Sequence, residues 1–116
     1  MAGRKYKQLL IQPYGYWLWA FSDWEDYQAA CSKKTGKPFE EGRKPLGRTQ
    51  LLTLDQHRLI VIYAHDEATL AHELMHAIMM IFEEIKSDPR EGNGEPAAYL
   101  MSHIWTELLG QRRFKV

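Results

Sequence analysis

The chain has 116 residues with 15 basic and 15 acidic side chains, so its formal net charge is zero. This length corresponds to a single domain, 1–116, that can bury a core. The neutral balance gives no electrostatic reason to expect nucleic acid or a membrane as a partner. Cys31 is the only cysteine, which excludes an internal disulfide and a zinc site built from cysteines.

No segment predicts a membrane span or a leader. A bilayer span needs about 18 consecutive apolar residues, and no run here approaches that length. The basic N-terminus is followed by Leu9-Leu10-Ile11, but Gln12-Pro13 comes directly after it. The apolar stretch is therefore too short for a signal peptide, and we expect a cytoplasmic protein of the cell that makes it.

The N-terminal part predicts two strands. The first is short, at 7–11, and the second is the aromatic segment 14–21, since aromatic residues favour strands. Alternation along the second strand places apolar side chains on both of its faces. This favours a strand buried on two sides, with a platform for a ligand or partner as the alternative. One face holds Trp17, Trp19 and Phe21, and the other holds Tyr16, Leu18 and Ala20.

A helix and a loop are predicted next. Ser22 and Glu25 have the spacing of a capping box, which predicts a helix at 23–34 that stops at Gly36. The following stretch, 36–48, is rich in glycine and proline and predicts a loop. Its basic residues fit a solvated loop better than a nucleic-acid surface.

Two more strands are predicted at 51–55 and 58–63, joined by a turn at 55–58. The chain leaves the second of these strands and enters the next helix within a few residues. We therefore expect 58–63 to lie at the rim of a site on that helix and to offer a free edge to an extended peptide. The alternative is an interior strand that is paired on both sides.

The C-terminal part predicts two helices. Asp66 caps the first, which runs to about Lys86 and is stopped before Pro89. The second is expected at 95–109 and ends at Gly110. The order of elements predicts an α+β fold, in which a small antiparallel sheet packs on helices and the motif-bearing helix is followed by a C-terminal helix.

The first of these helices contains the pattern H-E-x-x-H as His72, Glu73 and His76. Residues four apart lie on one face of a helix, with Cβ atoms roughly 5–6 Å apart, so the two imidazoles are placed to bind one zinc ion. Glu73 lies further round the helix, where a carboxylate reaches a water rather than the ion and can act as a general base. The alternative is a pair of histidines hydrogen-bonded in a helical core.

A catalytic zinc ion needs a third protein ligand. Glu95 is the best candidate, because it begins the next helix across a short loop. The alternative role for Glu95 is to complement the positive N-terminus of that helix. The rival carboxylates are Asp88, Glu91, Glu83 and Glu84.

At this point the chain resembles the gluzincins, the thermolysin-like metallopeptidases. Eighteen residues separate His76 from Glu95, and Glu95-Pro96-Ala97-Ala98 matches the E-x-x-A that follows H-E-x-x-H in that family. The resemblance covers about residues 50–110. It implies that His72, His76 and Glu95 bind zinc, that Glu73 is the general base, and that the substrate is a peptide or protein.

Larger gluzincins have a second domain that contributes a histidine or tyrosine to stabilise the oxyanion. The nearest substitutes here are Tyr99, His103 and His65. Tyr99 also stands where thermolysin-like enzymes have an aspartate that holds a ligand histidine, so its hydroxyl is a candidate for that supporting contact.

In its small size and in the sequence downstream of the motif, the chain also resembles small phage and prophage proteins with a reduced gluzincin core. This keeps a second hypothesis open: a phage or prophage structural or interaction protein that uses zinc to stabilise its fold without catalysis. A structural zinc site would have a fourth protein ligand, for which His65 and His103 are candidates.

Overall fold

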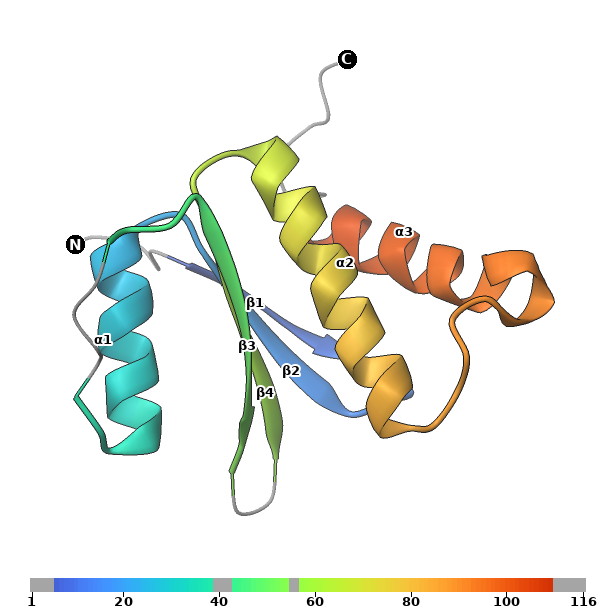
Figure 1. Cartoon of the computed structure of the whole chain (residues 1–116), viewed down its shortest axis with the longest axis horizontal. Helices are drawn as coiled ribbons and strands as arrows, with labels where there is room; N and C mark the ends of the chain where they lie inside the picture. The colour runs from blue at the N-terminus through green and yellow to red at the C-terminus, as the bar shows by residue number, and fades with distance from the viewer. Residues whose placement is uncertain (1–5, 39–42, 55–56, 110–116) are drawn as a thin grey trace.

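The computed structural model describes residues 6–38, 43–54 and 57–109. These residues form a four-stranded sheet and three α-helices (Figure 1). The elements in chain order are β1 (Tyr6–Ile11), β2 (Tyr16–Phe21), α1 (Trp24–Thr35), β3 (Gly47–Thr53), β4 (Arg58–Ala64), α2 (Glu67–Glu84), the short 3-10 helix η1 (Glu91–Gly94) and α3 (Glu95–Leu109). The predicted turn residues Asp55 and Gln56, part of the predicted loop, and Gly110 lie outside the described residues.

The sheet has the strand order β1-β2-β4-β3. β1 pairs with β2 and β3 pairs with β4 in antiparallel fashion, but β2 and β4 are parallel. The α+β class is confirmed, whereas the prediction of a purely antiparallel sheet is wrong. The reason is that α1 and β3 both lie between β2 and β4 in the chain, and this long crossover allows β4 to enter the sheet in the direction of β2.

The prediction that residues 58–63 form an edge strand is also wrong. β4 pairs with β2 along one side and with β3 along the other, and its side chains from Leu59 to Ala64 are all buried. A strand buried on both faces is a near-continuous apolar run. The edge strand that packs against α2 is instead β3.

Helices cover both faces of the sheet. α2 and α3 bury their apolar residues against one face, where Tyr16, Leu18, Ile60 and Ile62 lie. α1 covers part of the other face and packs with Phe21, Val61 and Tyr63. The predicted division of the side chains of β2 between two faces is confirmed. Tyr16 and Leu18 are buried on one face and Phe21 on the other, whereas Trp17 and Trp19 are only half-buried beside Phe21.

Local signals set the ends of the helices. The N-cap of α1 is Asp23, whose carboxylate accepts from the Asp26 amide at 2.9 Å, rather than the predicted Ser22. Gly36 ends α1 in the left-handed conformation, as predicted. The Asp66 carboxylate accepts from the Thr69 amide at 2.8 Å and so caps α2. None of the helices in the described part of the chain combines the length and apolar character that a bilayer span requires.

Candidate metal centre

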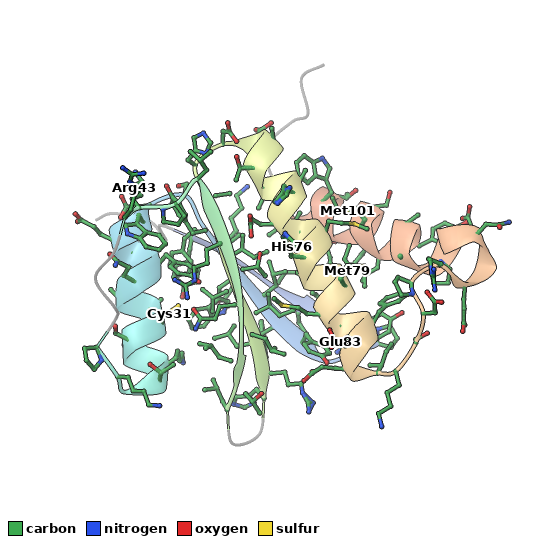
Figure 2. All side chains as sticks on the ribbon, viewed as in Figure 1. Cys31, Arg43, His76, Met79, Glu83 and Met101 are labelled. Atoms are coloured by element: carbon green, nitrogen blue, oxygen red, sulfur yellow. The ribbon has the colours of Figure 1, made fainter. Side chains whose placement is uncertain are left out.

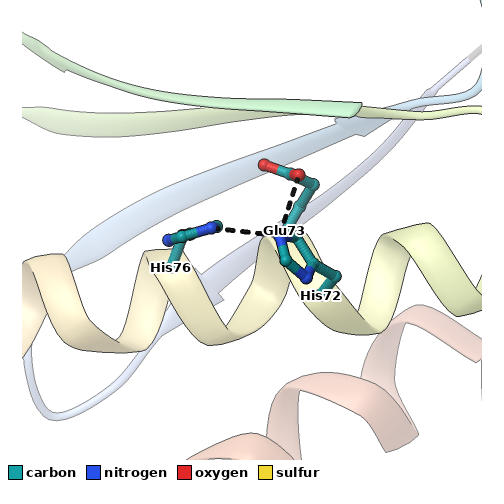
Figure 3. A group of neighbouring side chains, drawn as sticks. All are labelled: His72, Glu73 and His76. Atoms are coloured by element: carbon teal, nitrogen blue, oxygen red, sulfur yellow. Dashed lines mark hydrogen bonds and ion pairs between the residues drawn. The ribbon is translucent and has the colours of Figure 1, made fainter. Parts of the chain in front are cut away.

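His72 and His76 lie one turn apart on α2, and their side chains converge (Figure 3). Their Nε2 atoms are 3.2 Å apart, and both residues are exposed. The periodicity of the helix brings them together. The buried side of α2, with Leu74, Ala77 and Ile78, holds the helix against the sheet. The two imidazoles therefore present their nitrogens to solvent from a fixed support.

Glu73 points from α2 toward the sheet (Figure 3). It is the only buried charged residue in the described part of the chain. Its Oε1 accepts a hydrogen bond of 2.6 Å from the hydroxyl of Thr49 on β3. The same hydroxyl lies 3.1 Å from the carbonyl oxygen of Glu73. The Glu73 Oε2 lies 4.0 Å from the Nε2 of His72. One carboxylate oxygen is thus held by the sheet, and the other faces the histidine pair.

Gly47 leaves room for this carboxylate. A Cβ at this position would come within 2.5 Å of the Thr69 methyl carbon and 2.9 Å of the Glu73 Oε2. Contacts this short do not occur in real structures, so any side chain here would push on Glu73. Gly47 and Thr49 are two apart on β3 and therefore face the same side of the sheet. The edge strand shapes the position of the buried carboxylate.

The ligand atoms of His72, Glu73 and His76 lie within 4.8 Å of one another, which is compact enough to hold a metal ion. The arrangement combines two exposed imidazole nitrogens with one buried carboxylate. Neutral imidazole and carboxylate are both common metal ligands. The group can therefore act as a metal-binding site, and the carboxylate can instead serve as a proton acceptor beside it.

Glu95 is not part of this group. It is the first residue of α3 and is exposed. Figure 1 shows α3 beginning at the far right of the molecule, away from the middle of α2. The left-handed conformations of Gly92, Asn93 and Gly94 set the direction in which the chain enters α3. The structure therefore brings together two of the three predicted ligands, with the predicted base between them.

The three candidates for oxyanion stabilisation or for contacts behind the metal also lie outside the group. Tyr99 and His103 are exposed on α3. His65 lies just before α2, and its Nδ1 is 3.2 Å from both the Leu46 carbonyl oxygen, just before β3, and the Thr69 hydroxyl. Its Nε2 is 3.1 Å from the Asp66 carboxylate. His65 thus links the entry to β3 with the first turn of α2.

Thr49 and Gly47 are not among the site residues predicted from the sequence. Thr49 lies between the predicted loop at 36–48 and the predicted strand at 51–55, and Gly47 lies within that loop. The available signal was the pattern Gly47-Arg48-Thr49-Gln50 before an apolar pair, which extends the strand by alternation. The contact with Glu73 bridges 24 positions of sequence, and spacing within one element carries no information about it.

Comparisons with known proteins gave no match: no family model, curated protein or solved structure resembles this chain closely enough to assign a relationship.

Proposed function

We propose that His72 and His76 bind one zinc ion and that the protein is a zinc-dependent peptidase with Glu73 as its general base. The observation that carries this proposal is the convergence of two exposed imidazoles, 3.2 Å apart at Nε2, beside a buried carboxylate. The gluzincin resemblance of the H-E-x-x-H motif supports the same roles for these three residues.

The two imidazoles fit zinc. A catalytic zinc ion usually has a third protein ligand, and because Glu95 lies outside the group, water and substrate would complete the coordination here. Two ligands of a tetrahedral zinc ion at about 2.0–2.1 Å each lie about 3.3–3.4 Å from one another, close to the 3.2 Å found between the two Nε2 atoms. One neutral imidazole donating to the other gives a similar separation, so the distance alone does not separate the two explanations. Glu73 provides the second argument.

A buried carboxylate is costly without a positive partner. Among the described residues, Glu73 forms one ion pair: its Oε2 lies 4.0 Å from the Nε2 of His72. The hydroxyl of Thr49 supplies a hydrogen bond but no charge. A divalent cation on the two imidazoles would place positive charge beside this carboxylate. The burial of Glu73 therefore favours a metal over a simple histidine pair.

Zinc, when bound, supplies a Lewis acid that lowers the pKa of water and polarises a peptide carbonyl. The hydroxyl of Thr49 already donates a hydrogen bond to the Oε1 of Glu73, so Oε2 is the atom that takes a proton from the attacking water. Glu73 then returns that proton to the leaving nitrogen of the cleaved peptide. The burial of Glu73 fixes its carboxylate, so little reorganisation accompanies the proton transfers.

The outer edge of β3 is the proposed place for the substrate. β3 is the last strand of the sheet and packs against α2, and it carries the threonine that holds Glu73. An edge strand pairs with an extended peptide through backbone hydrogen bonds. A peptide added along β3 would run next to the strand that holds the general base.

The test is hydrolysis of a fluorescein-labelled casein by zinc-loaded protein without a histidine tag. Glu73→Gln keeps the shape of the side chain and its acceptor for Thr49 but removes the base, so the rate should fall by about 10²–10⁴-fold. Glu83→Gln is the matched control, because Glu83 is exposed further along the same helix (Figure 2). No hydrolysis by the wild-type protein, or equal rates for wild type and Glu73→Gln, would contradict the peptidase proposal and leave a non-catalytic zinc protein.

A further inference from the structure

A second candidate site lies on the opposite face of the sheet from His72 and His76. A pocket of about 180 Å³ opens there beside the end of α1. Its walls come from β1, β2, β4, α1 and the segments next to the β3-β4 turn. The lining residues are Gln8, Trp17, Trp19, Lys34, Leu54, His57 and Leu59.

The pocket exists because α1 covers only part of this face. Trp24 of α1 packs against Tyr63 with ring centroids 5.2 Å apart, near the end of β4. Trp17 pairs with Leu59 at the other end of the two parallel strands. Trp17 and Trp19 remain half-buried there, so the face keeps two indole rings in contact with solvent.

The lining has a definite chemistry. Its surface is mainly apolar. Among the described lining residues, the only lysine or arginine is Lys34, whose ammonium lies 5.0 Å from the centre of the Trp19 ring. Gln8 and His57 add hydrogen-bonding groups, and the described residues of the lining include no carboxylate. Aromatic walls favour a flat apolar group, and the Lys34 ammonium favours a negative charge.

The volume limits the size of the ligand. A cavity of about 150 Å³ accommodates benzene, so 180 Å³ corresponds to a single aromatic ring. We propose that this pocket binds a small aryl carboxylate, with the ring against Trp17 and Trp19 and the carboxylate at Lys34. The site shares no residue with the metal centre, and the proposal does not depend on peptidase activity.

The test is an NMR titration of the full chain with 3-phenylpropionate, observed at the indole N–H signals of the tryptophans. We expect the Trp17 and Trp19 signals to shift, with a Kd of about 1 mM for a ligand of this size. The neutral analogue 3-phenylpropanamide should bind roughly threefold to fivefold more weakly, the effect of one exposed ion pair.

Two variants assign the charge preference. Lys34→Met keeps an apolar stem over Trp19 but should bind the acid and the amide equally. Lys37→Met is the matched control, since Lys37 is exposed nearby but does not line the pocket, and it should keep the preference for the acid. The proposal is overturned if neither indole signal responds, if wild type binds acid and amide equally, or if Lys34→Met keeps the preference. Tighter binding of the dipeptide acetyl-Phe-Asp-amide than of 3-phenylpropionate would also overturn it, in favour of a protein partner.

Discussion

The hydroxyl of Thr49 donates a 2.6 Å hydrogen bond to the Oε1 of Glu73 and so joins the edge strand β3 to the middle of α2. The bond links the one buried carboxylate of the described residues to the sheet. It fixes which oxygen of Glu73 faces the histidine pair. The candidate metal centre therefore depends on both β3 and α2, although its H-E-x-x-H motif lies in α2 alone.

Thr49→Val should destabilise the fold by about 1–3 kcal/mol, because it leaves a buried carboxylate oxygen without its donor. Thr49→Ser keeps the hydroxyl and should recover most of the loss. Thr53→Val is the control, since Thr53 is exposed on the same strand. Urea unfolding curves measure all three variants. Equal stability of Thr49→Val and Thr53→Val would show that the hydrogen bond is energetically unimportant.

Gly47→Ala should also destabilise the fold, by about 1–3 kcal/mol, because the added carbon overpacks the contact with α2. The shortest contact would be with the methyl group of Thr69. Thr69→Ser removes that methyl group, so the double variant should lose less stability than the sum of the two single variants. Strictly additive losses in the unfolding free energies would rule out this contact as the cause.

Tyr16 gives the fold a dependence on alkaline pH. Its hydroxyl donates to Glu84, which also pairs with Arg58 at 2.9 Å. Burial, followed by the Glu84 contact, raises the pKa of Tyr16 from 10.0 to about 12. The folded state thus holds the phenol proton more tightly than the unfolded state. The stability from this group is complete below pH 10 and declines as the pH rises toward 12.

Tyr16→Phe should therefore cost about 1–2 kcal/mol at neutral pH, and its difference from wild type should shrink above pH 10. Tyr14→Phe serves as the control on a half-buried tyrosine. Unfolding free energies measured from pH 8 upward would reveal the trend. A wild-type advantage that stays constant across this range would mean that the Tyr16 proton is not linked to folding.

Local sequence patterns predicted α2, its cap and its motif, because a helix and its facing residues are set by neighbours within a few positions. Strand order was not predictable in the same way. Closeness to α2 in the chain is the reason to expect the free edge at 58–63. The run Leu59–Tyr63 is apolar at every position, which is typical of an interior strand and was the available sign that β4 is paired on both sides.

The prediction for Glu95 depended on distance along the chain, which does not determine the direction of the next helix. Three successive left-handed residues, Gly92, Asn93 and Gly94, precede α3 and redirect it. With Glu95 exposed outside the group, Glu95→Gln should bind zinc with the affinity of the wild-type protein. Isothermal titration calorimetry measures this directly. A large loss of zinc affinity in Glu95→Gln would restore Glu95 as a ligand and require α3 to approach α2 when metal binds.

Metal analysis of untagged protein after dialysis measures whether His72 and His76 hold zinc. We expect one zinc ion per chain in the wild-type protein and in His103→Asn, an exposed histidine on α3. We expect His72→Asn and His76→Asn each to lose the metal, because one imidazole cannot hold it alone. Stoichiometric zinc in both of these variants, or none in the wild-type protein, would show that the two histidines do not hold zinc.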